Sequence, residues 1–198
     1  MEKNKSDSQI LKILLKQFTI KWGITSLAKE INMTRVGIWK VLKKLEVKKL
    51  ISLSPIGEGK TSTFIISLNW ENPLLEKTLE LILIEDALKN QRWISNFIEI
   101  KNKLNFLILY GSIIHSPKEA NDIDILGVIS NKKDFNFIEK AIQGIQKSQI
   151  KKIHSENFTK IEFKEEIRKP NKIFIDAIKK GVVLFGQEKF IKFIKEVY

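Results

Sequence analysis

The chain has 198 residues, of which 43% are hydrophobic and 29% are charged, a balance typical of a folded protein rather than a disordered one. It contains no cysteine and two histidines, which excludes disulfides and cysteine-ligated metal sites and disfavours a histidine-rich metal site. Its formal net charge of +12 favours a polyanionic partner, most often nucleic acid.

The charge is concentrated towards the N-terminus. Residues 1–72 carry 13 Lys and Arg against 6 Asp and Glu, a net charge of +7, whereas the other 126 residues carry a net charge of +5. The N-terminal segment is polar, and no stretch approaches 18 uncharged apolar residues. We therefore expect no membrane association and a cytoplasmic protein.

Three helices are expected at the N-terminal end. Residues 7–18 and 24–31 place apolar side chains at helical spacing. Thr34 is suited to cap the start of a third helix that runs to about Leu45. The side chains expected to form the buried stripe of that helix are Ile38, Leu42 and Leu45.

A hairpin is expected next, because residues 50–55 and 63–68 read as strands around a Gly-Glu-Gly-Lys turn. The segment SLAKEINMTRVGIWKVLKKLEVKKLI, followed by IGEGKTS, resembles the winged helix-turn-helix regulators of bacteria and archaea over about residues 7–70. The resemblance implies that double-stranded DNA is the partner. The alternative is a small helical domain used for protein contact.

In such a domain the start of the third helix reaches base edges, while basic residues on the helix and wing contact phosphates. Trp39 is interpreted as a side chain that packs within its own domain. The residues expected to bind DNA are Thr34, Arg35, Gly37, Lys40, Lys43, Lys44 and Lys60.

A long apolar helix is expected at residues 73–90, with Pro73 in its first turn. Its apolar residues surround the helix almost completely, so it should be buried on more than one side. Two arrangements satisfy this: burial between two domains, or contact with a second copy in a homodimer. We divide the chain into an N-terminal domain (1–72), a connecting or dimerisation region (73–100) and a C-terminal domain (101–198).

Two aspartates characterise the C-terminal domain. A buried strand from Leu104 ends at Gly111-Ser112, and the next strand begins with Asp122-Ile123-Asp124. Strand alternation places both carboxylates on one face, where a divalent cation such as Mg²⁺ can offset their repulsion. The Gly-Ser turn offers backbone N–H groups and a hydroxyl to an anion. The pattern therefore predicts a metal–triphosphate site, and its alternative is a solvated strand end.

The Gly-Ser pair, followed after nine residues by Asp-apolar-Asp, resembles the minimal nucleotidyltransferases of the DNA polymerase β superfamily over about residues 92–198. The tail IKKGVVLFGQEKF is similar to the end of many such domains. The resemblance implies that Gly111 and Ser112 bind the triphosphate of a nucleotide, most often ATP. It also implies that Asp122 and Asp124 bind Mg²⁺ and are catalytic.

Active members of this family use a third carboxylate on a later strand. The segment QIKKIHSENF is interpreted as that strand and offers only Glu156, which is the expected third catalytic residue. On frequency alone, Glu156 is a solvated surface residue. His115 and His154 are interpreted as surface residues.

These features predict an α+β protein: a winged helix domain, a connecting helix and a nucleotidyltransferase-like domain with a mixed sheet. The expected function is a DNA-binding transcriptional regulator that binds nucleotide and Mg²⁺. The alternative is an active nucleotidyltransferase that transfers AMP to a protein or small-molecule acceptor, as some antitoxins do, and that uses its winged helix for autoregulation. A third class, a pure protein-interaction module, is disfavoured by the charge.

Overall fold

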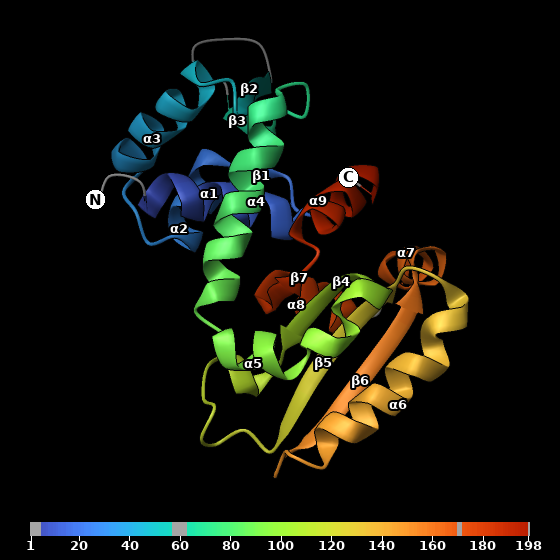
Figure 1. The fold of residues 1–198 in the computed structure, drawn as a ribbon. Coiled ribbons are helices and arrows are strands. Elements are labelled where there is room, and N and C mark those ends of the chain that lie inside the picture. The colour runs from blue at the N-terminus through green and yellow to red at the C-terminus, as the bar shows by residue number, and fades with distance from the viewer. Residues whose placement is uncertain (1–4, 57–62, 170–171, 198) are drawn as a thin grey trace. The chain divides into compact units, whose positions relative to one another are not determined.

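The computed structural model describes residues 5–56, 63–169 and 172–197 and has an α+β fold, as the sequence predicted. It contains a three-stranded antiparallel sheet and a four-stranded mixed sheet (Figure 1). Contacts divide the chain into two compact units, the first reaching Ile82 and including Ile194–Glu196, the second spanning Leu83–Phe193. No helix in the described part of the chain has the length and apolar character needed to cross a membrane.

The first unit combines three helices with a small sheet. Its elements are α1 (Lys5–Lys16), β1 (Trp22–Gly23), α2 (Ile24–Glu30), α3 (Arg35–Val47), β2 (Ile51–Ile56) and β3 (Thr63–Leu68). The expected cap is confirmed, because Thr34 Oγ1 accepts a hydrogen bond from the Gly37 amide at 3.0 Å. The expected buried stripe of α3 is confirmed as well, since Ile38, Leu42 and Leu45 are fully buried.

The sheet of the first unit has the strand order β1-β3-β2. The expected hairpin strands pair in antiparallel register from Ile51 opposite Leu68. The short strand β1 was not anticipated; it adds Trp22 opposite Ile66 and covers the free edge of β3. The expected Gly-Glu-Gly-Lys turn lies outside the described residues.

The next segment is helical and contains α4 (Pro73–Leu88), α5 (Gln91–Asn96) and the 3-10 helix η2 (Ile98–Lys103). One side of α4 is buried and includes Leu75, Leu79, Ile82 and Leu83. Within this chain the helix is not buried all round, because another side keeps apolar side chains exposed. Leu74, Leu81 and Leu88 are each more than half exposed.

The four-stranded sheet of the second unit has the order β6-β5-β4-β7. Its strands are β4 (Leu104–Tyr110), β5 (Asp122–Ile129), β6 (Lys152–Thr159) and β7 (Val182–Phe185). The β5–β6 pair is parallel, while β4 is antiparallel to both β5 and β7. Figure 1 shows β5 and β6 side by side.

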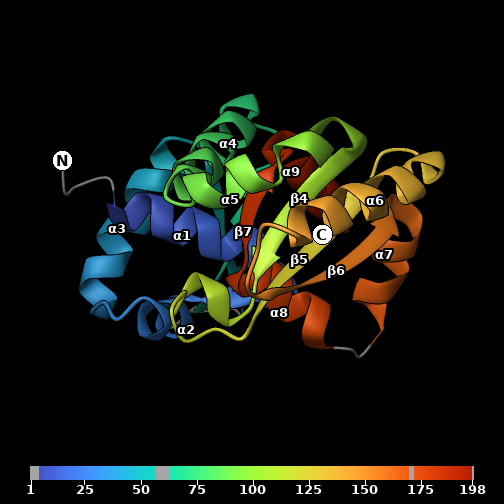
Figure 2. The same ribbon diagram turned by 60° about the horizontal axis from the view of Figure 1, so that its bottom comes forward.

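Helices and short 3-10 turns connect these strands or, in the case of α9, follow the last of them. They are η3 (Ser112–Ile114), η4 (Lys132–Asp134), α6 (Phe135–Gln146), α7 (Lys160–Arg168), α8 (Lys172–Lys180) and α9 (Gln187–Val197). Figure 2 shows α6 running along β6. The expected tail corresponds to the end of α8, strand β7 and the first turn of α9.

Strand alternation gives the sheet two buried faces. On one face Leu109 and Ile125 pack in a cluster with Trp93 of α5 and Ile138 of α6. On the other face Phe106 contacts three aromatic rings, with ring centroids 5.4–6.1 Å away. Those rings belong to Phe163, Phe190 and Phe193. The strands β4, β5 and β7 are therefore packed on both faces, while β6 keeps polar side chains such as Glu156 exposed along its length.

Candidate functional site

The candidate site lies at one end of the four-stranded sheet, where β4 ends and β5 begins. Tyr110 is paired with Asp124, and Asp124 is paired with His154 of β6, so the three residues form one row across three strands. Asp122 lies on the same face, two residues before Asp124. The next row on this face contains Leu126, which is fully buried. The polar row is therefore the boundary between the aromatic core and solvent.

Two carboxylates and one imidazole converge in this row. The Nδ1 atom of His154 lies 3.5 Å from Asp122 Oδ2 and 3.5 Å from Asp124 Oδ1. Ligand atoms from all three residues lie within 4.8 Å of one another. The two aspartates are partly buried and His154 is exposed. The expected same-face placement of the aspartates is confirmed, and the group has the donor atoms and spacing to hold a metal ion.

The carboxylates change the pKa of their neighbours. Burial raises the pKa of Asp124 above its ordinary value of 3.8, the charge of Asp122 raises it further, and His154 opposes both effects. The pKa of Tyr110 is raised to about 12, first by burial and then by the charges of Asp124, Glu156 and Asp122. Burial is the larger cause of both shifts, and the negative charge of neighbouring carboxylates is the second; a bound cation would offset that charge.

Position 111 requires a glycine, because any side chain there would collide with Asp124. Its φ of +81° and ψ of −167° belong to a region that side chains rarely adopt. A Cβ atom at this position would lie 2.2 Å from Asp124 Oδ2, so the backbone of the turn packs directly against the carboxylate. The predicted phosphate-binding turn and the predicted metal ligand are therefore in contact.

Ser112 begins the short turn η3 and is exposed. The turn is closed by hydrogen bonds from the amides of Ile114, His115 and Ser116 to the carbonyls of Gly111 and Ser112, at 2.9–3.5 Å. None of these three bonds is donated by Ser112 itself. Ser112 directly follows Gly111, and its N–H group and hydroxyl are groups that can donate to an anion.

Glu156 is not part of the converging group. It is exposed, pairs with Leu126 and lies two residues beyond His154 on β6. His154, interpreted from the sequence as a surface residue, instead occupies the place beside the aspartates. The signal that could have identified His154 is the parallel register of β5 and β6, which the sequence of either strand alone does not contain. His115, the other histidine, is exposed at the end of η3 and is not in the group.

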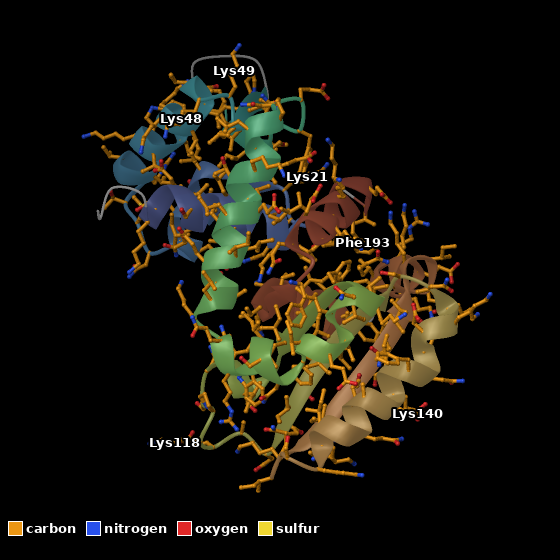
Figure 3. All side chains as sticks on the ribbon, viewed as in Figure 1. Lys21, Lys48, Lys49, Lys118, Lys140 and Phe193 are labelled. Atoms are coloured by element: carbon orange, nitrogen blue, oxygen red, sulfur yellow. The ribbon has the colours of Figure 1, made fainter. Side chains whose placement is uncertain are left out.

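Two side chains hold the strand ends that carry the site. The Gln146 side chain accepts a hydrogen bond from the Ile153 amide at 2.7 Å, which ties α6 to β6 next to His154. The Lys151 ammonium donates to the carbonyls of Lys118 and Ala120, in the connection that leads to Asp122. Figure 3 labels Lys118 in that connection.

The second candidate site is the exposed side of α3. Arg35 and Lys40 are exposed and make no ion pair with the residues that the structure describes. Lys43 lies 2.8 Å from Glu46 and 4.8 Å from the centroid of the Trp39 ring. That ring also packs against Phe64 of β3, as expected for a side chain that packs within its own domain.

The other residues expected to bind DNA have structural roles as well. Lys44 forms an ion pair with Asp7 of α1 at 2.6 Å. Thr34 caps α3, and a Cβ atom on Gly37 would lie 3.0 Å from Thr34 Oγ1, so this glycine gives the cap its space. Lys60 lies outside the described residues. Figure 3 shows Lys48 and Lys49 beyond the end of α3, where they add to the basic character.

Comparisons of the chain with protein-family models, with curated proteins and with solved structures found no match.

Proposed function

We propose that the chain is a DNA-binding transcriptional regulator with a nucleotidyltransferase-like domain that binds a nucleoside triphosphate and a divalent cation. The observation that carries the proposal is the contact between Gly111 and the Asp124 carboxylate. A phosphate-binding turn and a pair of cation-binding carboxylates can bind the same molecule only when they lie next to each other. Triphosphate bound to a divalent cation is a ligand that needs both.

The residues of the site have separate tasks in this proposal. Asp122 and Asp124 hold the cation, and their converging oxygen atoms fit it. Gly111 and the Ser112 N–H and hydroxyl hold phosphate oxygens, since no side chain at Gly111 obstructs their approach. When bound, Mg²⁺ supplies the positive charge that neutralises both the carboxylates and the phosphate oxygens. ATP is the proposed nucleotide.

The DNA-binding half of the proposal is supported by the first unit. Its element order, α1-β1-α2-α3-β2-β3, and its sheet order, β1-β3-β2, are those of a winged helix. Arg35 and Lys40, which are exposed and without ion partners among the described residues, are proposed to contact the duplex most directly. Lys43 and Lys44 contribute less, because each already has a carboxylate partner.

A second candidate function is nucleotide transfer, most often of AMP, to a protein or small-molecule acceptor. It relies on Glu156, which lies two residues beyond His154 on β6 and so on the same face of the sheet as Asp122 and Asp124, although it is outside the converging group. Incubation with labelled ATP, CTP, GTP and UTP, a divalent cation and the products of neighbouring genes tests it. In this version Glu156→Gln abolishes transfer while nucleotide binding persists.

We also propose that the protein is a homodimer. The exposed Leu74, Leu81 and Leu88 lie seven residues apart along α4, so they project from one side of the helix. A second copy that presents the same stripe would remove these side chains from water. The two-fold operators that winged helices read are consistent with this arrangement.

Nucleotide binding is tested by thermal unfolding with each nucleoside triphosphate in the presence of Mg²⁺. The preferred triphosphate should raise the melting temperature of the wild-type protein, because a ligand that binds only the folded state stabilises it. The double variant Asp122→Asn, Asp124→Asn should lose this response. A charge-matched control, Glu99→Gln with Asp176→Asn, changes two exposed carboxylates of the same unit and should retain it. If no triphosphate raises the wild-type melting temperature, the nucleotide half of the proposal is wrong.

A further inference from the structure

We propose that His154 is a third metal ligand beside Asp122 and Asp124, and that the site therefore takes a divalent first-row transition-metal ion in preference to Mg²⁺. The inference rests on the cation-binding part of the proposed function and refines the identity of the metal. The proposed metal binding requires neither nucleotide nor DNA. It also assigns a role to a side chain that sequence reasoning placed on the surface.

The distances suit a single ion. Zinc-like ions lie about 2.0–2.2 Å from nitrogen and oxygen ligands, which separates two ligand atoms by about 3.4 Å in a tetrahedral site and about 3.0 Å in an octahedral one. Nδ1 of His154 lies 3.5 Å from an oxygen atom of each aspartate. The ligand atoms of all three side chains lie within 4.8 Å of one another, so the side chains must rotate towards a common point to share one ion.

The backbone holds the three ligands in place. Asp122 and Asp124 are on β5, and the parallel register sets His154 directly beside Asp124. The Ile153 amide, next to His154, is bonded to Gln146 of α6. Behind Asp124 the turn at Gly111 leaves no room for a further side chain. Ligands that are already positioned lose little conformational entropy when the ion binds.

The donor set determines which metal is preferred. Mg²⁺ favours an all-oxygen octahedron and loses its water reluctantly, whereas Mn²⁺, Co²⁺ and Zn²⁺ accept imidazole nitrogen together with carboxylate oxygen. Three protein ligands also leave coordination positions open for water or phosphate oxygens. An imidazole in place of a third carboxylate also lowers the negative charge of the site. This loss of charge weakens the binding of Mg²⁺ more than that of Mn²⁺, Co²⁺ or Zn²⁺, which gain a nitrogen ligand instead.

The chain offers few competing sites for such an ion. It has no cysteine, so thiolate binding is excluded, and it has two histidines in total. His115, the second one, is exposed and is not part of the converging group among the described residues. It therefore provides a matched control for the loss of one imidazole.

The test is isothermal titration of tag-free, EDTA-treated full-length protein with CoCl₂ and with MgCl₂. We expect Co²⁺ to bind at least about tenfold more tightly than Mg²⁺. We expect His154→Gln to weaken Co²⁺ binding by about tenfold or more, with a much smaller effect on Mg²⁺. His115→Gln should change neither affinity. Circular dichroism of each variant shows whether it is folded.

A spectroscopic measurement makes the test independent of whether His154→Gln folds. In His115→Gln protein the single remaining imidazole is His154, so its ring nitrogens can be followed by NMR without assignment. Added Zn²⁺ should shift the Nδ1 resonance most. Equal Co²⁺ and Mg²⁺ affinities in the wild-type protein, or an Nδ1 resonance that Zn²⁺ leaves unchanged, would overturn the inference.

The outcomes also separate this inference from the proposed function. Tight, His154-dependent Co²⁺ binding in a protein that no triphosphate stabilises would support the metal assignment and contradict nucleotide binding. Stabilisation by ATP and Mg²⁺ without any preference for Co²⁺ would support nucleotide binding and contradict the role of His154.

Discussion

Replacement of Gly111 by alanine perturbs the contact on which the site depends. The added methyl group would occupy a point 2.2 Å from Asp124 Oδ2 and 3.2 Å from Asp124 Cγ. Either the carboxylate moves or the turn does. Both movements separate the Gly-Ser turn from the carboxylate, so Gly111→Ala should weaken cation and nucleotide binding as well as stability.

The size of the stability loss follows from two contributions. A side chain held at φ +81° and ψ −167° costs on the order of 1–3 kcal/mol. The overlap with Asp124 adds to this cost, because either the carboxylate or the turn must move to relieve it. For a chain of this length each kcal/mol lowers the melting temperature by about 2–4 °C. A decrease of several degrees is therefore expected.

Thermal unfolding followed by circular dichroism measures the loss, with Gly144→Ala as the matched control. Gly144 lies in α6 and is exposed, and a Cβ atom added there would meet nothing within 4 Å beyond the backbone of its own helix and its chain neighbours. Alanine there should stabilise the helix by about 0.5–1 kcal/mol. The two glycine replacements should therefore act in opposite directions.

A double variant separates the two contributions. In an Asp124→Ala background the overlap is absent, so Gly111→Ala should cost less than it does in the wild-type background. The reasoning is refuted if Gly111→Ala is as stable as the wild type, or if its cost is the same in both backgrounds.

Three further predictions concern DNA, pH and assembly. Arg35→Ala and Lys40→Ala should each weaken duplex binding and reduce the salt slope by about one, measured by fluorescence anisotropy; unchanged slopes would contradict phosphate contacts. Because the pKa of Asp124 is raised in the folded state, its ionisation costs stability as the pH rises above 3.8. The melting temperature of Asp124→Asn relative to the wild type should therefore increase from acidic to neutral pH; a constant difference would contradict this. Light scattering should give about twice the monomer mass of 23.0 kDa, and Leu81→Glu should reduce the measured mass to that of a single chain. A Leu81→Glu protein that keeps the dimer mass would show that α4 is not the interface.

Local patterns predicted much of this fold. Alternation in DIDILGVI correctly placed Asp122 and Asp124 on one face, and the Thr34 cap correctly marked the start of α3. Both features depend on neighbours within a few residues. The two-residue strand β1 was missed because so short a segment has no periodicity and exists only through its pairing with β3.

The third member of the metal group was not predictable in the same way. His154 and Glu156 are two residues apart and therefore point to the same face of β6. The strand pattern alone cannot decide which of them lies beside the aspartates. The parallel register decides it, by pairing His154 with Asp124 and Glu156 with Leu126. That register joins residues about 30 positions apart in the sequence, so the pattern of neither strand contains it.

The most direct test of the account is isothermal titration of ATP into the full-length protein, with Mg²⁺ present and again with EDTA. The account predicts binding that requires the metal and that is lost in the folded double variant Asp122→Asn, Asp124→Asn. Absence of binding by the wild type to ATP and to the other three triphosphates, or equal binding by the double variant, would contradict it.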